Sequence, residues 1–124
     1  MAIMEGKAMF VWVKETEEYQ GKDTGRYAVT LVLNDETSEE LANNGVRLRS
    51  YGEGDNVILQ RKFVSNYPVR VIDAEGNALE DFPSGSKVRI SYKYGNEHPI
   101  HGVPVYMDGI RVLEMGGVGG DPAL

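Results

Sequence analysis

Hydrophobic and polar residues alternate with a period of two along most of this chain, which is the pattern of β-strands that bury one face. The clearest case is the segment SKVRISYKYG at 86–95, where the alternation separates an apolar side from a cationic side. The apolar side holds Val88, Ile90, Tyr92 and Tyr94, and the other side holds Lys87, Arg89, Ser91 and Lys93. The pattern predicts a strand whose apolar side faces the core and whose cations face outward.

The same period predicts further strands at 7–14, 26–33, 56–63, 69–79 and 103–115, the last with a bulge or bend at Asp108-Gly109. In the strand 7–14, strict alternation places Val13 on one face and both Ala8 and Trp12 on the other. The polar segment 15–25, which contains two glycines, is predicted to be a loop.

One short helix is predicted at about residues 37–44. Thr37 and Glu40 have the spacing of a capping box, acidic residues crowd the first turn, and Gly45 suits the position after the last turn. A helix of about two turns is not stable alone, so we expect it to dock through Leu41.

Five or six strands with one short helix predict an all-β fold, either a small OB-type β-barrel or a sandwich. Aromatic and cationic side chains on the strand faces favour the five- or six-stranded OB-type barrel. We expect one domain over residues 1–115, followed by a flexible Gly-rich tail at 116–124.

The composition is that of a soluble globular protein, with 41% hydrophobic and 26% charged residues. No apolar run is long enough to cross a membrane, and the first residues lack a secretory signal, so no membrane association and a cytoplasmic location are expected. The absence of cysteine excludes a disulfide framework and thiolate metal sites.

The formal net charge of -6 argues against a nucleic-acid partner, but the charge is unevenly distributed. Residues 1–55 hold 6 Lys/Arg and 11 Asp/Glu, whereas residues 56–115 hold 7 of each. Because a local patch governs docking more than the total does, the sequence still permits a small basic groove.

Enzymatic chemistry finds little support among the sequence motifs. There is no Gly-x-Ser-x-Gly nucleophile motif and no phosphate-binding loop, and the paired carboxylates lie in segments expected to be solvated. His98 and His101 have a spacing that could ligate a metal together with Glu97 or Asp108, but a metal site needs three or four ligands and no third histidine exists, so an ordinary polar loop explains them better. We therefore expect a non-enzymatic protein with no cofactor and no metal.

Nucleic-acid binding is the chemistry that the strand faces favour. Sequence-tolerant single-strand binders combine cations that follow the phosphates with aromatic rings that stack on bases. Here Trp12 shares a face with Lys14, Arg61 shares a face with Phe63, and the stripe Lys87–Lys93 accompanies Tyr92 and Tyr94. The alternative is that Phe63 and other aromatic residues are core, and that the cations are simply the solvated face.

Several short motifs resemble those of the single-stranded DNA-binding proteins of short-tailed bacteriophages. They are Asp73-Ala74-Glu75-Gly76, Gly85-Ser86-Lys87-Val88 and Val112-Leu113-Glu114-Met115, and they occur in the order of that family. The segments GRYAVTLVLND and NVILQRKF are also similar to family strands, so that the resemblance covers roughly residues 6–115. Family members usually continue into a long acidic tail, whereas this sequence ends after a Gly-rich run with Asp121.

The resemblance implies an OB fold that binds single-stranded DNA without base specificity in phage DNA replication, recombination and repair. It carries DNA contact over to Arg61, Phe63, Lys87, Arg89, and Tyr92 or Tyr94, and more loosely to Arg26. The face arguments add Trp12, Lys62 and Lys93. Implied partners are single-stranded DNA and phage replication proteins such as a polymerase or helicase-primase. A homodimer and the cytoplasm of an infected bacterial host fit the same interpretation.

Two other functions remain open from the sequence. A β-rich protein-interaction or virion structural module would explain the acidic surface better and the cationic stripe worse. A small metal-dependent hydrolase would have to use His98 and His101.

Overall fold

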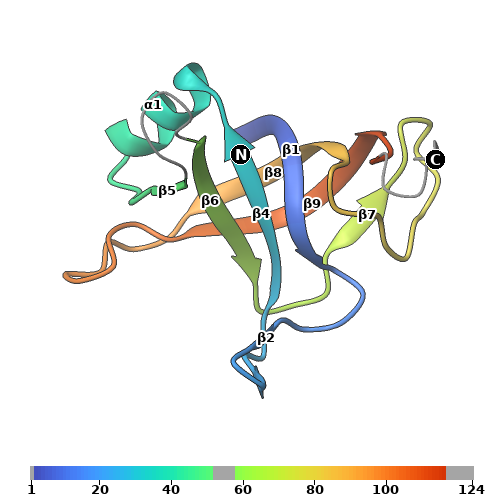
Figure 1. Ribbon diagram of the computed structural model, residues 1–124, viewed down its shortest axis with the longest axis horizontal. Helices are drawn as coiled ribbons and strands as arrows, with labels where there is room; N and C mark the ends of the chain where they lie inside the picture. The colour runs from blue at the N-terminus through green and yellow to red at the C-terminus, as the bar shows by residue number, and fades with distance from the viewer. Residues whose placement is uncertain (1, 52–57, 117–124) are drawn as a thin grey trace.

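Five long strands close into a barrel in the computed structural model, which describes residues 2–51 and 58–116 (Figure 1). The barrel strands are β1 (Ala2–Trp12), β4 (Tyr27–Leu33), β6 (Ile58–Ser65), β8 (Lys87–Tyr94) and β9 (Val105–Glu114). They pair in the ring order β1-β4-β6-β9-β8 and back to β1, antiparallel except for the parallel contact of β6 with β9. The predicted all-β, OB-type barrel is confirmed.

Four short strands lie outside this ring. Strand β5 (Arg49–Tyr51) extends the sheet beside β6, and β7 (Arg70–Ile72) runs parallel to β9. Strands β2 (Glu18–Tyr19) and β3 (Lys22–Asp23) form a separate hairpin within the segment predicted to be a polar loop. The loop prediction for 15–25 is therefore wrong in part, because strands of two residues leave no periodic signal.

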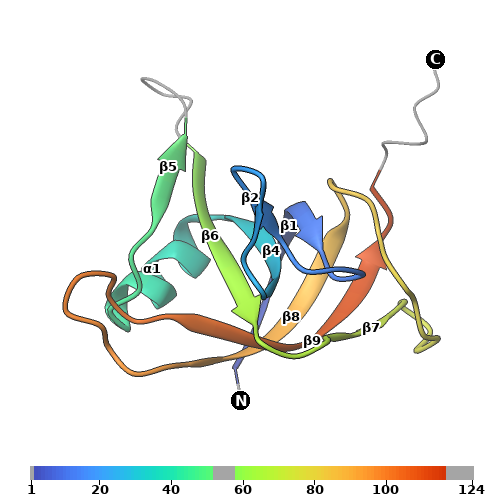
Figure 2. The ribbon, with the colours of Figure 1, turned by 90° about the horizontal axis from the view of Figure 1, so that it is seen from below.

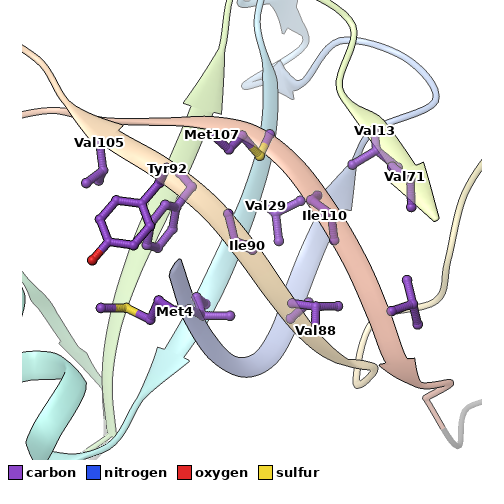
Figure 3. Close-up of a cluster of buried hydrophobic side chains, with 14 of the residues drawn as sticks. Met4, Val13, Val29, Val71, Val88, Ile90, Tyr92, Val105, Met107 and Ile110 are labelled. Carbon is purple, nitrogen blue, oxygen red and sulfur yellow. The ribbon is translucent and has the colours of Figure 1, made fainter. Parts of the chain in front are cut away.

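The hydrophobic core fills the inside of the barrel (Figure 3). On β8 the apolar residues Val88, Ile90 and Tyr92 are at most 1% exposed, as the alternation predicts. The ring of Tyr92 meets that of Phe63 edge-to-face, with centroids 5.3 Å apart. This aromatic pair is among the largest fully buried groups and stabilises the barrel where β6 faces β8.

A β-bulge in β1 breaks the strict alternation expected for 7–14. Met9 pairs with Thr30, but Trp12 pairs with Ala28, so β1 carries one extra residue between these two pairs. The extra residue coincides with Phe10, whose φ of 49° lies in the left-handed region. As a result Ala8 and Val13, which alternation assigned to opposite faces, are both buried.

Helix α1 (Asp35–Asn43) begins two residues earlier than predicted. Its N-cap is Asn34, whose side-chain oxygen accepts from the backbone N–H of Thr37, while the Thr37 hydroxyl accepts from the N–H of Asn34. Thr37 is therefore the third helical residue of a capping box that begins at Asn34, and not the N-cap of a box with Glu40 as its predicted spacing implied. Leu41 is fully buried and docks the helix, and Gly45 follows with a φ of 83°, both as predicted.

The remaining strand features agree with the sequence except at their ends. The register of β8 against β9 skips Asp108, which confirms the predicted bulge at Asp108-Gly109. The predicted strand 69–79 is reduced to β7, because Asp73 begins a turn. Of the predicted Gly-rich tail only Gly116 is described, and its N–H donates to the Ser86 hydroxyl at 2.8 Å.

Within the described ranges, no helix has the length and apolar character needed to cross a bilayer.

Candidate nucleic-acid interface

A groove with a volume of about 740 Å³ crosses the outside of the barrel over β4 and β6. Its walls are the end of β1, the β2–β3 hairpin, β5 and the loop 95–104 that joins β8 to β9. Of the predicted site residues, Trp12, Arg26, Arg61 and Lys62 line this groove. The structure thus brings together four predicted residues that come from two strands, β1 and β6, and from the loop before β4.

The β2–β3 hairpin forms one wall and projects beyond the end at which β4 begins (Figure 1, Figure 2). Its two-residue turn is Gln20-Gly21, and both residues have positive φ, as a type I′ turn requires. The hairpin joins the barrel through the Glu17 N–H, which donates to the Arg26 carbonyl at 2.8 Å. The Thr24 N–H in turn donates to the Glu17 carbonyl, so Glu17 is fixed at the base of the hairpin.

Lys62 projects from the outer face of β6, where it pairs with Thr30 of β4. Its Nζ lies 2.7 Å from Glu17 Oε2 and 5.9 Å from the centroid of the Tyr19 ring. The Lys62 side chain is 42% exposed, whereas that of Glu17 is only 11% exposed. The hairpin therefore supplies both a carboxylate and an aromatic face to this one cation.

Arg61 points the other way, toward the rim of the barrel interior, on the face that it shares with Phe63. Its Nη1 donates to the Arg47 carbonyl at 3.1 Å, and its buried Nε has no hydrogen-bond partner among the described residues. Burial, and then the nearby charge of Arg49, lowers the pKa of Arg61 from its ordinary range. The guanidiniums of Arg49 and Arg61 thus lie close to each other in the lining of the groove.

Four aromatic residues accompany these cations: Phe10, Trp12, Tyr19 and Tyr106. Phe10 is 58% exposed although it is large and apolar, and the left-handed backbone of the bulge presents it to the groove. The ring of Tyr106 lies against Gly95, where an added Cβ would come within 2.5 Å of the ring. Glycine at 95 therefore leaves the space that the Tyr106 ring occupies.

The loop 95–104 brings both histidines to the opposite wall. The Nδ1 of His98 accepts from the backbone N–H groups of Ile100 and His101, and the two imidazole rings lie 4.7 Å apart. No group of three or more metal-ligating side chains occurs among residues 2–51 and 58–116. Through these two hydrogen bonds His98 fixes the conformation of the loop, and both rings lie at the edge of the groove.

Phe63 and Tyr92 do not belong to this site, and their prediction as stacking residues has to be corrected. They are 0% and 1% exposed, because the apolar side of each strand packs into the barrel. Burial also raises the pKa of the Tyr92 hydroxyl above its ordinary range. Tyr94 packs edge-to-face on Tyr92 with centroids 5.6 Å apart, and it does not line the groove.

Lys87, Arg89 and Lys93 lie outside the groove, on what we term the outer wall, the outward face of β8. Arg89 pairs with Glu5 of β1, with Nε and Nη2 at 2.9 and 2.8 Å from Oε2. Lys93 pairs in register with Tyr106 and so lies at the border between wall and groove. The structure does not bring these three cations to the groove aromatics, and their contact with DNA stays a prediction.

Sequence reasoning missed Arg49, Tyr19 and Tyr106 as residues of the groove. Arg49 lies on β5, which is too short to show alternation. Tyr19 could have been found from the Gln20-Gly21 dipeptide that follows it, since this pair suits a two-residue hairpin turn. Tyr106 stood in a predicted strand on the side opposite the apolar residues, which was a usable signal.

No protein-family model matches the chain, and no curated protein matches it in sequence. Solved structures do match. The single-stranded DNA-binding protein of bacteriophage Enc34, solved in complex with single-stranded DNA, aligns with a TM-score of 0.64 and 11% identity, over 89% of this chain and 83% of that one. The gp2.5 single-stranded DNA-binding protein of bacteriophage T7 aligns with a TM-score of 0.51 and 15% identity, over 98% and 91%.

A further structure of the Enc34 protein gives a TM-score of 0.62 at 9% identity, over 97% of this chain and 83% of that one. The resemblance expected from the sequence motifs is therefore confirmed, and at this level of identity it shows the fold. The chain has the OB fold of these phage single-stranded DNA-binding proteins.

Proposed function

We propose that the chain binds single-stranded DNA without base specificity in the groove over β4 and β6. The observation that carries the proposal is the meeting, in one groove, of four aromatic residues with the cations Arg26, Arg49, Arg61 and Lys62. A base–aromatic stack contributes roughly 1–3 kcal/mol for any base, and cations neutralise the phosphates between stacked bases. The shared fold with the single-stranded DNA-binding proteins of bacteriophages Enc34 and T7 supports the same assignment.

In this proposal the protein is non-enzymatic and works by covering exposed single strands during phage DNA replication, recombination and repair. It would act in the cytoplasm of an infected bacterial cell, as a homodimer, beside replication proteins such as a polymerase or helicase-primase. The groove is open along the barrel face rather than a closed pocket, which suits a long flexible chain better than a small substrate.

The test is binding to a fluorescent oligo-dT of about 30 nucleotides across a salt series, with a matched duplex as control. We expect binding that spares the duplex and weakens with salt, with a slope of about -0.7 per neutralised phosphate. Trp12 is the single tryptophan and lines the groove, so its emission should be quenched by the bound strand. Absence of binding at low salt would favour a protein-interaction module instead.

A further inference from the structure

We propose that the Glu17 carboxylate is an internal competitor of DNA, occupying the position at Lys62 that a backbone phosphate takes when a strand binds. This inference rests on the proposed function and adds to it a residue that sets the affinity of the groove. Glu17 and Glu18 are acids in a groove that also holds four cations, and Glu17 lies directly on one of those cations, Lys62.

The position of Glu17 is built into the fold. Its backbone N–H donates to the Arg26 carbonyl and its carbonyl accepts from Thr24, both at 2.8 Å. The residue is 8% exposed, so its carboxylate is held at Lys62 rather than sampling solvent. A carboxylate 2.7 Å from an ammonium has the charge and distance that a phosphate oxygen would have in the same place.

A phosphate and the Glu17 carboxylate cannot both sit at Lys62 without strong repulsion between them. Like charges placed together in an interface weaken binding, so the strand must either displace Glu17 or forgo Lys62. Displacement is structurally possible because β2 and β3 form a sheet of their own, separate from the barrel sheet. Moving Glu17 with the hairpin would break its hydrogen bond to the Arg26 carbonyl but would leave the ring of barrel strands intact.

The neighbouring residue provides a matched control. Glu18 also lines the groove and carries the same charge, but it is exposed and forms no ion pair with any described residue. Glu18→Gln removes one negative charge from the groove without touching Lys62. Any difference between Glu17→Gln and Glu18→Gln therefore isolates the ion pair from the general loss of an acidic charge.

The experiment measures oligo-dT affinity at low salt for wild type, Glu17→Gln, Glu18→Gln, Lys62→Gln and the double variant Glu17→Gln/Lys62→Gln. We expect Glu17→Gln to bind about tenfold more tightly than wild type, and Glu18→Gln to gain no more than about twofold. Lys62→Gln should weaken binding in both backgrounds, but more strongly in the Glu17→Gln background, where it should remove most of the gain. Melting temperatures of all five proteins confirm that they are folded.

If Glu17→Gln proves unstable, Glu17→Asp serves instead, since it keeps the charge and shortens the reach to Lys62; a gain in affinity is expected here too. Equal affinities of Glu17→Gln and Glu18→Gln would overturn the inference and leave the proposed function intact. Weaker binding by Glu17→Gln would overturn it as well, and would show that Glu17 positions Lys62 for DNA. If neither wild type nor Glu17→Gln binds oligo-dT, the proposed function fails first and this inference with it.

Discussion

The groove and the outer wall of β8 each carry at least three cations, but they differ in what surrounds those cations. In the groove the cations meet four aromatic rings inside a concave surface. On the outer wall Arg89 is paired with Glu5 on an exposed sheet face. The outward residue between Arg89 and Lys93 is Ser91, which offers no aromatic ring. The sequence pattern alone would have favoured the outer wall, because the alternation of cations is clearest on β8.

This difference shows what an alternating pattern can establish. A period of two says which residues share a face of a strand, but not whether that face is concave, covered or crossed by another segment. The groove exists because the hairpin and the loop 95–104 rise on either side of β4 and β6, which is a property of the closed barrel. Stacking and phosphate contact need both residue types in one place, and only the three-dimensional arrangement provides that.

The largest effect is expected on stability, at Phe63, which the sequence predicted as a site residue but which lies in the core. Phe63→Ala should lower the free energy of unfolding by about 3–5 kcal/mol, because it removes a fully buried ring and leaves a cavity beside Tyr92. Urea denaturation followed by circular dichroism measures this. Unchanged stability with reduced DNA affinity would contradict the core assignment and would indicate that Phe63 contacts DNA.

An aromatic residue of the groove should show the opposite behaviour. Tyr106→Ala should weaken oligo-dT binding by roughly 1–3 kcal/mol, the contribution of one base stack, with a smaller effect on unfolding. Tyr67→Ala is the matched control, since Tyr67 is 77% exposed and lies outside the groove. Equal anisotropy titrations for the two variants would mean that Tyr106 does not contact bases.

The two cationic surfaces can be compared directly by removing one arginine from each. Arg49→Gln should weaken binding severalfold and reduce the magnitude of the salt slope by about 0.7, the value for one phosphate contact. Arg89→Gln tests the predicted contact of the outer wall: if the strand follows the groove alone, affinity and slope should stay close to wild type, because Arg89 lies outside the groove and pairs with Glu5. The reverse result would move the DNA path onto the outer wall.

The sequence predicted most of the barrel because its long strands alternate hydrophobic and polar residues. On β8 the buried and exposed residues fall as expected from Val88 to Lys93. The pattern failed at the β1 bulge, where one extra residue at Phe10 reverses the faces that follow. It also assigned Arg61 and Phe63 correctly to one face without showing that this face is the inner one.

The groove was only half predictable for a related reason. The ion pair of Lys62 with Glu17 joins residues far apart in sequence, and nothing in either local pattern points to the other. Two of the three motifs that carried the resemblance, those at Asp73 and at Gly85-Ser86, proved to form turns, and the third lies at the end of β9. Ser86, for example, is fully buried and donates to the Pro83 carbonyl at 2.7 Å, while Gly85 has a φ of 93°. Such motifs identify the fold, whereas the site depends on how segments cross it.

The smallest effect is expected on stability, at Asp73. This residue belongs to one of the motifs that resemble the phage family, and it lies away from the groove. Hydrogen bonds from the backbone N–H groups of Asn77 and Glu75 lower the pKa of its carboxyl below the ordinary value of 3.8. A group with a lowered folded pKa contributes stability above its unfolded pKa and loses that contribution as the pH falls through the folded value.

Asp73→Asn should therefore be slightly less stable than wild type at pH 7, and the difference should shrink as the pH falls from about 4 toward 2. Urea midpoints of the two proteins across this range measure the effect, and oligo-dT affinity at pH 7 should be the same for both. A stability difference independent of pH would assign the effect to the lost hydrogen-bond geometry rather than to charge. A change in affinity would show that the turn at Asp73 reaches the DNA, and would erase the distinction between residues that shape the barrel and residues that line its groove.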